Sequence, residues 1–137
     1  MGKDKILEKI RQYVVSNYYK INKSDMILGE LSYNYRCHLN SVQKVKEGKA
    51  DKVYLCIEID WDDDFVCVHF INGKGNKYID NTLGWRYEQI DYYVIREVDE
   101  SEYHDIWNLL NDTKKFLFNL YATWVDKYIL RIKHTII

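Results

Sequence analysis

Hydrophobic positions near the start of the chain recur with the spacing of an α-helix. Between residues 3 and 20 the apolar side chains lie three or four positions apart, with Lys, Glu, Arg and Gln between them: Ile6, Leu7, Ile10, Val14 and Tyr18. This pattern predicts an amphipathic helix. Residues 22–31, "NKSDMILGEL", follow it and are typical of a turn or short helix.

Helical spacing resumes at about Cys37 and stops at Gly48. On one side of this second helix lie Leu39, Val42 and Val45. The pattern therefore predicts a helix that carries a cysteine at its first turn.

The middle of the chain has the pattern of strands. Four stretches are rich in β-branched and aromatic residues, at 52–59, 65–71, 77–82 and 90–98. The first three are joined by short connections, the acidic "DWDDD" at 60–64 and the glycine-containing "GKGN" at 73–76. Short connections between sequential strands predict antiparallel pairing rather than βαβ units.

Helical spacing returns after Asp99 and Ser101, either of which suits an N-cap. It runs to about residue 132, and "NDT" at 111–113 predicts a break into two helices. The elements together predict one α+β domain over residues 1–137. An antiparallel sheet of about four strands would pack against the Cys-bearing helix, with N-terminal and C-terminal helices around it. Several apolar residues fall off the main stripe of the C-terminal helices and predict a homodimer through them: Phe116, Phe118, Ile129 and Leu130.

Composition narrows the classes of function. The 137 residues are 47% hydrophobic, which suffices for one buried core, and the net charge of −1 argues against nucleic acid as a partner. Three cysteines without CxxC spacing argue against a disulfide scaffold. The most apolar stretch, 116–125, is too short to span a bilayer, so we expect no membrane partner and a cytoplasmic location. The absence of proline and the abundance of Lys, Asn and Tyr are typical of AT-rich coding DNA, as in many phages, and would then indicate the host cytoplasm.

Cys37, His69 and Asp80 stand in an order that suits nucleophilic chemistry. A helix N-terminus and a nearby imidazolium both stabilise a thiolate. His69 lies on the second predicted strand and Asp80 on the third, so a hairpin would make them neighbours. A carboxylate beside the imidazole would hold it in the tautomer that accepts the thiol proton.

These residues resemble the papain-like fold, and especially its transglutaminase-like branch. "VHFINGKGNKYIDNTLG" (68–84) is similar to the hairpin that carries the His and Asp of that branch, and the resemblance covers about residues 30–98. It implies Cys37 as nucleophile, His69 as base and Asp80 as orienting acid. Position 31 is Leu, where the papain branch has a Gln for the oxyanion hole, so the Cys37 N–H with Asn34 or Tyr33 would take that role.

The resemblance implies an enzyme acting on acyl bonds through a thioester: a peptidase, amidase, deamidase or transamidase. Its substrate would be a protein or peptide, with no metal and no organic cofactor. The alternative is a non-catalytic protein-binding module, such as a phage-type inhibitor of a host protein. In that case exposed aromatic side chains would carry the function.

Simpler interpretations apply to the other polar features. Cys56 and Cys67 fall in apolar strands and are expected in the core, and His38 is expected to face solvent or cap the helix. "DWDDD" could ligate a hard cation, but a solvated turn is favoured. "GKGN" fits a hairpin turn better than a phosphate loop. "GWRYEQIDYY" (84–93) could line a groove or a partner surface, although core packing explains most of it.

Overall fold

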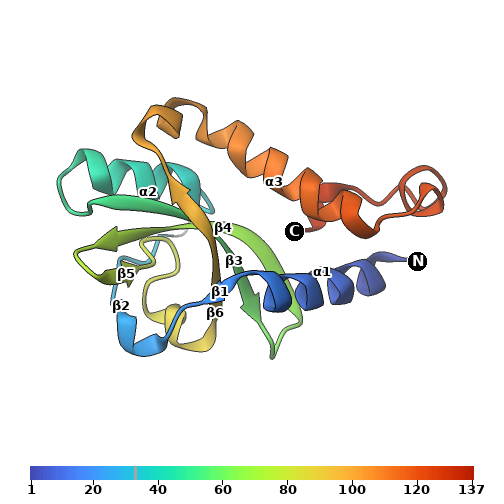
Figure 1. Ribbon diagram of the computed structural model, residues 1–137, viewed down its shortest axis with the longest axis horizontal. Coiled ribbons are helices and arrows are strands. Elements are labelled where there is room, and N and C mark those ends of the chain that lie inside the picture. The colour runs from blue at the N-terminus through green and yellow to red at the C-terminus, as the bar shows by residue number, and fades with distance from the viewer. Residues whose placement is uncertain (33) are drawn as a thin grey trace.

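A curled, mixed sheet with helices on one face forms the body of the protein (Figure 1). The computed structural model describes residues 1–32 and 34–137, and within them the sheet has six strands. The α-helices are α1 (Lys3–Asn17), α2 (Cys37–Lys46) and α3 (Ile106–Tyr121). The strands are β1 (Tyr19–Lys20), β2 (Met26–Ile27), β3 (Lys52–Asp60), β4 (Phe65–Lys74), β5 (Lys77–Ile79) and β6 (Asp91–Val98).

The strand order is β1-β6-β3-β4-β5-β2, and all neighbours are antiparallel except β2 and β5, which are parallel. The α+β class and the strands predicted at 52–59, 65–71 and 90–98 are confirmed. The sheet is larger than the predicted set of about four antiparallel strands, because it has six strands and one parallel pair. Two-residue strands extend both edges of the sheet, and strands this short leave no periodic signal in the sequence.

The third predicted strand, 77–82, is shorter than expected. β5 ends at Ile79, and Asp80 begins a turn in which its carboxylate accepts hydrogen bonds from the backbone N–H groups of Thr82 and Leu83. An Asp that bonds the backbone two and three residues ahead favours a turn over an extended strand. Asp80 therefore follows the strand instead of lying on it.

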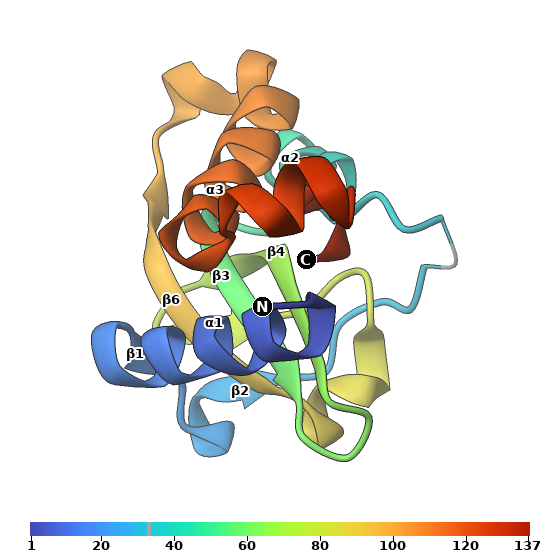
Figure 2. The same ribbon diagram turned by 90° about the vertical axis from the view of Figure 1, so that its right-hand side faces the viewer.

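Helices α1, α2 and α3 cover one face of the sheet, as Figure 2 shows from the helical end. Alternate residues of β3 and β4 point to this face and meet the helices in the main core. From α1 this core receives Ile6, Ile10 and Val14, and from the strands Val53, Leu55, Ile57, Val66, Val68 and Phe70. The two predicted helices at 3–20 and from Cys37 are confirmed.

The opposite face of the sheet closes over a smaller core. It is covered by the segment around β2 and by the turn that precedes β6, and it contains Ile21, Met26, Cys56, Ile71, Ile90 and Tyr92. Because side chains alternate along a strand, Glu58 on β3 and His69 on β4 share this side with Cys56 and Ile71. Two polar side chains thus enter an otherwise apolar layer.

The C-terminal helix differs from its prediction. A 3₁₀ turn, Glu100–Asp105, begins with a capping box between Asp99 and Glu102, and α3 then continues through 111–113 without the expected break. Thr113 fits inside the helix because its hydroxyl donates to the Leu109 carbonyl at 2.8 Å. The helix instead ends at Ala122, whose ψ is 124°, and a π-helical turn, Val125–Ile129, follows.

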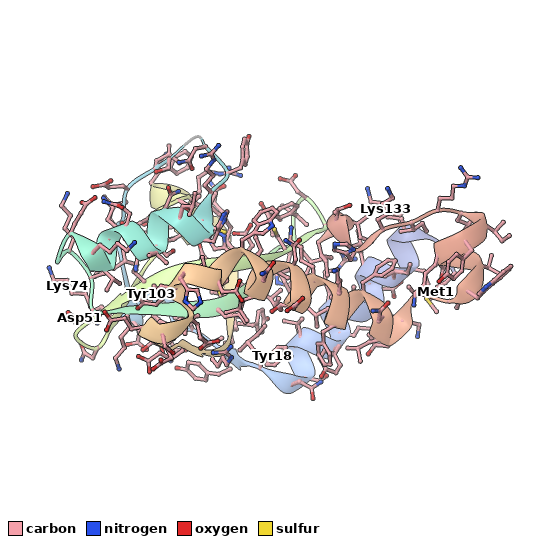
Figure 3. All side chains as sticks on the ribbon, turned by 90° about the horizontal axis from the view of Figure 1, so that it is seen from above. Met1, Tyr18, Asp51, Lys74, Tyr103 and Lys133 are labelled. Carbon is pink, nitrogen blue, oxygen red and sulfur yellow. The ribbon has the colours of Figure 1, made fainter. Side chains whose placement is uncertain are left out.

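The chain beyond α3 exposes much apolar surface. In Figure 3 this segment lies at the end of the molecule marked by Met1 and Lys133, away from the end marked by Asp51 and Lys74. Phe116, Ile129 and Leu130 are exposed as predicted, whereas Phe118 is buried in the core. The homodimer remains a prediction. None of the helices in residues 1–32 and 34–137 is long and apolar enough to cross a membrane.

Candidate active site

Cys37 is the first residue of α2, as the sequence predicts. The N-terminus of a helix presents unpaired N–H groups and a partial positive charge, both of which favour a thiolate. The side chain is largely buried, with 8% of its surface exposed, but it lines a pocket of about 500 Å³ together with His69 and Glu58. A ligand in this pocket therefore reaches the sulfur and the imidazole together.

His69 and Asp80 are in direct contact. The Nε2 atom of His69 lies 2.9 Å from Oδ2 of Asp80, and both side chains are buried. The contact follows from the pairing of β4 with β5, in which Asn72 lies opposite Ile79. The turn after β5 then brings Asp80 back beside His69. The predicted neighbourhood of these two residues is confirmed.

The Asp80 carboxylate is held on every side. Its Oδ1 accepts the two turn N–H groups at 2.9 Å each, and its Oδ2 accepts the hydroxyl of Tyr92 as well as His69. Burial alone would raise the pKa of Asp80, but the charge and hydrogen bond of His69, the Leu83 N–H and the Tyr92 hydroxyl lower it to about 2. The group is an anion in a fixed orientation.

The thiol of Cys37 is correspondingly acidic. Burial acts to raise its pKa, but the positive charge of His69 and interactions with the imidazoles of His38 and His69 and the Phe70 backbone lower it to about 6. Burial raises the pKa of Cys67 to about 12 and that of Cys56 well above its usual value. Of the three free cysteines, Cys37 alone has a pKa lowered below the usual value of a thiol.

The imidazole of His69 has a raised pKa, which favours its positively charged form. Burial would lower its pKa, but the carboxylates of Glu58 and Asp80 and the thiolate of Cys37 raise it well above the usual value. A thiolate and an imidazolium therefore face the same pocket, with Asp80 bound to Nε2. Because Nε2 is bonded to Asp80, Nδ1 is the ring nitrogen that does not take part in that bond.

A buried network of amide side chains fixes α2 against the Asp80 turn. Asn72 donates to the Ser41 carbonyl at 2.9 Å and accepts from Asn81 at 2.8 Å. Asn40 donates to the Thr82 hydroxyl at 3.0 Å. These bonds join the helix that carries Cys37, the strand that carries His69 and the turn that carries Asp80 into one polar scaffold.

Close packing behind the Asp80 turn requires a glycine. A Cβ on Gly29 would lie 2.3 Å from the Asp80 carbonyl oxygen and 2.7 Å from the Ile79 side chain. The chain before α2 therefore packs directly against the backbone of the Asp80 turn, with no room for a side chain at position 29.

Asn34 and Tyr33 were the two side chains predicted to stabilise an oxyanion, and the structure describes one of them. Asn34 is exposed in the segment before α2, where its amide donates to Asn40 and its carbonyl accepts the Arg36 N–H. Tyr33, the other candidate, lies outside the described residues. Asn34 remains a prediction for this role.

The structure differs from the sequence interpretation at two residues near the nucleophile. His38 was expected to face solvent or to cap the helix, but Arg36 is the N-cap of α2. His38 is buried against Trp107, with ring centroids 5.3 Å apart, because α2 packs on α3. Cys67 was expected in the core but is only half-buried and lines the pocket. Cys56 is buried as predicted.

Two residues of the site carried no clear signal in the sequence. The sequence did not distinguish Tyr92 from the other aromatic residues of the predicted strands. Glu58 is an acid between Ile57 and Ile59 in an apolar strand, and an unexplained charge at such a position was the available clue.

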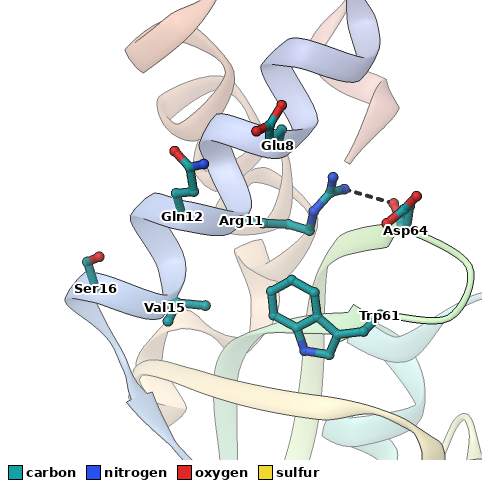
Figure 4. Close-up of a pocket in the computed structure, with 7 residues that line it drawn as sticks. All are labelled: Glu8, Arg11, Gln12, Val15, Ser16, Trp61 and Asp64. Carbon is teal, nitrogen blue, oxygen red and sulfur yellow. Dashed lines mark hydrogen bonds between the residues drawn. The ribbon is translucent and has the colours of Figure 1, made fainter.

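Another hollow lies between α1 and the turn joining β3 to β4 (Figure 4). Its wall includes Trp61, Val15 and Arg11, and Arg11 donates to the Asp64 carbonyl at 2.9 Å. The described residues that line it include neither cysteine nor histidine. The "DWDDD" segment is the strand end and turn of this hairpin, and "GKGN" is the β4–β5 connection.

Glu58, His69 and Asp80 also form a cluster whose ligand atoms lie within 4.8 Å of one another. A metal ion there would compete with the bonds already made, because both oxygens of Asp80 accept hydrogen bonds and Nε2 of His69 bonds to one of them. The geometry fits a hydrogen-bonded His–Asp pair better than a set of metal ligands.

The chain matches no family model and no curated protein, and its fold matches no solved structure.

Proposed function

We propose that the protein is a cysteine-dependent enzyme of the papain-like or transglutaminase-like kind that acts on acyl bonds of a protein or peptide. The observation that carries the proposal is the buried His69–Asp80 contact at 2.9 Å beside an acidic Cys37 at a helix start. The other two cysteines, Cys56 in the core and the half-buried Cys67, have raised pKa values.

The chemistry would proceed through a thioester. The Cys37 thiolate attacks the acyl carbonyl, and the carbonyl π electrons move to oxygen to give a tetrahedral oxyanion. As the oxyanion collapses, the bond to the leaving amine breaks and the amine takes the proton of the His69 imidazolium. Water or a second amine then attacks the thioester, gives its proton to His69 and releases the thiolate.

Asp80 would keep its charge throughout. Its bond to Nε2 fixes the ring and stabilises the imidazolium, and its own pKa of about 2 makes proton transfer to it unfavourable. The oxyanion would be stabilised by the Cys37 backbone N–H at the start of α2, with Asn34 as the candidate second donor.

Trapping of the thioester tests the proposal. The protein is mixed with a panel of p-nitrophenyl esters, and the acylated residue is mapped by mass spectrometry. We expect the acyl group on Cys37, its loss in Cys37→Ala and its retention in the matched control Cys67→Ala. Acylation spread evenly over all three cysteines, or none at all, would contradict the proposal.

A binding function is the second candidate, and the exposed aromatic surface after α3 favours it. Trp124 and Tyr128 stack with ring centroids 5.7 Å apart, and both are more than half exposed. Such a surface suits a protein partner or a second copy of the chain. If binding alone is the function, Cys37→Ala will retain it and Trp124→Ser will lose it.

A further inference from the structure

Glu58 is a buried acid that the mechanism above does not use. It lies on β3 opposite Cys67 on one side and Tyr92 on the other, and 4% of the residue's surface is exposed. His69 is opposite Cys56, two positions along, so Glu58 and His69 are diagonal neighbours. Their closest atoms, Oε2 and Nε2, are 3.7 Å apart.

The Oε2 atom of Glu58 is buried and has no hydrogen-bond partner among the described residues. No donor among the described residues reaches it, because the Nε2 of His69 is already bonded to Asp80 at 2.9 Å. A buried acceptor without a donor is costly and rare in proteins. Glu58 also lines the pocket of Cys37, so a ligand in that pocket can supply the donor.

The pocket is lined by acids and bases that differ in burial. Glu58 and Asp60 are buried acids, whereas the basic residues Arg86 and Lys114 are not buried. Burial raises the pKa of Glu58 to about 7, and the charge of His69 opposes that rise. An anionic group placed beside the thiol would therefore meet a carboxylate in a region shielded from water.

We propose that Glu58 determines specificity in the Cys37 pocket. Its Oε2 accepts a hydrogen bond from an N–H group carried by the acyl substrate, and its charge excludes substrates that carry a carboxylate there. This inference rests on the proposed function, since it assumes that the substrate approaches the Cys37 sulfur through this pocket.

Small alkylating reagents provide the test, because iodoacetamide and iodoacetate match in shape and differ in charge. Iodoacetamide carries a neutral carboxamide with N–H donors, iodoacetate carries a carboxylate, and N,N-dimethyl-iodoacetamide is neutral but has no N–H. Rates at Cys37 are measured at about pH 8, above the Glu58 pKa of about 7. For each protein the iodoacetamide rate is divided by the rate of one of the other two reagents, and this ratio is compared with the same ratio for a small free thiol. Both rates in a ratio depend on the same thiolate fraction, so a change in the pKa of Cys37 cancels.

The wild-type protein is expected to favour iodoacetamide over iodoacetate by roughly tenfold more than the free thiol does. It is also expected to favour iodoacetamide over the dimethyl compound, a comparison that needs no variant. In Glu58→Gln the preference for iodoacetamide over iodoacetate should fall to that of the free thiol or below it. The reason is that the His69 imidazolium then attracts the iodoacetate anion. The matched control Asp63→Asn removes an exposed acid from the same pocket and should keep the wild-type preference.

The results separate this inference from the proposed function. A reactive Cys37 without preference among the reagents would overturn the role of Glu58 and leave the thiol chemistry intact. An equal loss of preference in Asp63→Asn and Glu58→Gln would also overturn it, since general pocket charge would then be the cause. An unreactive Cys37 would overturn both proposals.

Discussion

The pocket lined by Cys37 and the segment after α3 differ in the kind of side chain that they bury. At the pocket, His69 and Asp80 are buried and paired with each other, and Asp80 also accepts hydrogen bonds from Tyr92 and two N–H groups. Beyond α3, apolar side chains are exposed, with Trp124 at 65% and Tyr128 at 64%. Both arrangements are unfavourable for a chain selected only to fold.

This contrast teaches where each candidate function would reside. Buried ionised groups are expensive, and a thiolate–imidazolium pair open to a pocket is useful for chemistry. Exposed aromatic residues cost less and suit a partner. Variants at the two regions should therefore separate catalysis from binding.

The largest effect is expected at the His69 imidazole. His69→Ala removes both the charge that stabilises the Cys37 thiolate and the proton donor, so thioester formation should fall by at least about 10³-fold. Stopped-flow acylation with a p-nitrophenyl ester measures it. His104→Ala, which removes an exposed histidine before α3, is the matched control and should react as wild type.

A gain in stability is expected when the unpaired acid is removed. The pKa of Glu58 is about 7 against an ordinary value of 4.5, so the wild-type carboxyl favours the folded state most below pH 4.5 and loses this as pH rises through 7. Glu58→Gln should therefore stabilise the protein by up to about 3 kcal/mol above neutral pH and by little in acid. Urea unfolding across pH tests this, and an equal change at every pH would contradict it.

A smaller loss is expected at Tyr92. Tyr92→Phe removes the hydroxyl that donates to Oδ2 of Asp80, so the carboxylate orients His69 less firmly. We expect thioester formation to slow by about tenfold and stability to fall by about 1–2 kcal/mol. Tyr93→Phe, on the opposite face of the same strand, is the matched control, and an equal effect there would remove the special role of Tyr92.

The smallest chemical effect is expected in the exposed segment. Trp124→Ser and Tyr128→Ser should change stability by less than about 0.5 kcal/mol and leave the acylation of Cys37 within about twofold of wild type. If the surface associates with a second copy, sedimentation of these variants will shift toward the monomer. A large loss of acylation would instead show that the two regions act as one functional unit.

Sequence patterns predict the Cys37–His69–Asp80 group because chain order alone nearly determines it. A cysteine at a helix start and a short hairpin leave few arrangements for the three residues. Glu58 lies diagonally opposite His69 across the β3–β4 hairpin, but the apolar pattern of β3 gave its charge no role. Tyr92 comes to the site through pairing of β3 with β6, which joins residues far apart in the chain. Local periodicity contains no information on that pairing.

The end of α3 was unpredictable for a similar reason. Asp126 is fully buried and accepts the N–H of Thr123 at 2.8 Å and that of Gly2 at 2.7 Å. The turn after Ala122 is thus stabilised by a contact with the other end of the chain. The local "NDT" pattern was a turn signal that tertiary packing overrode.

The pH dependence of Cys37 alkylation by iodoacetamide tests the central claim most directly. Because the thiolate is the reacting form, its rate should fall only as pH drops through about 6, with a plateau above, and His69→Ala should move that midpoint upward. A midpoint near the ordinary thiol value of 9, unchanged by His69→Ala, would contradict an ion pair between Cys37 and His69.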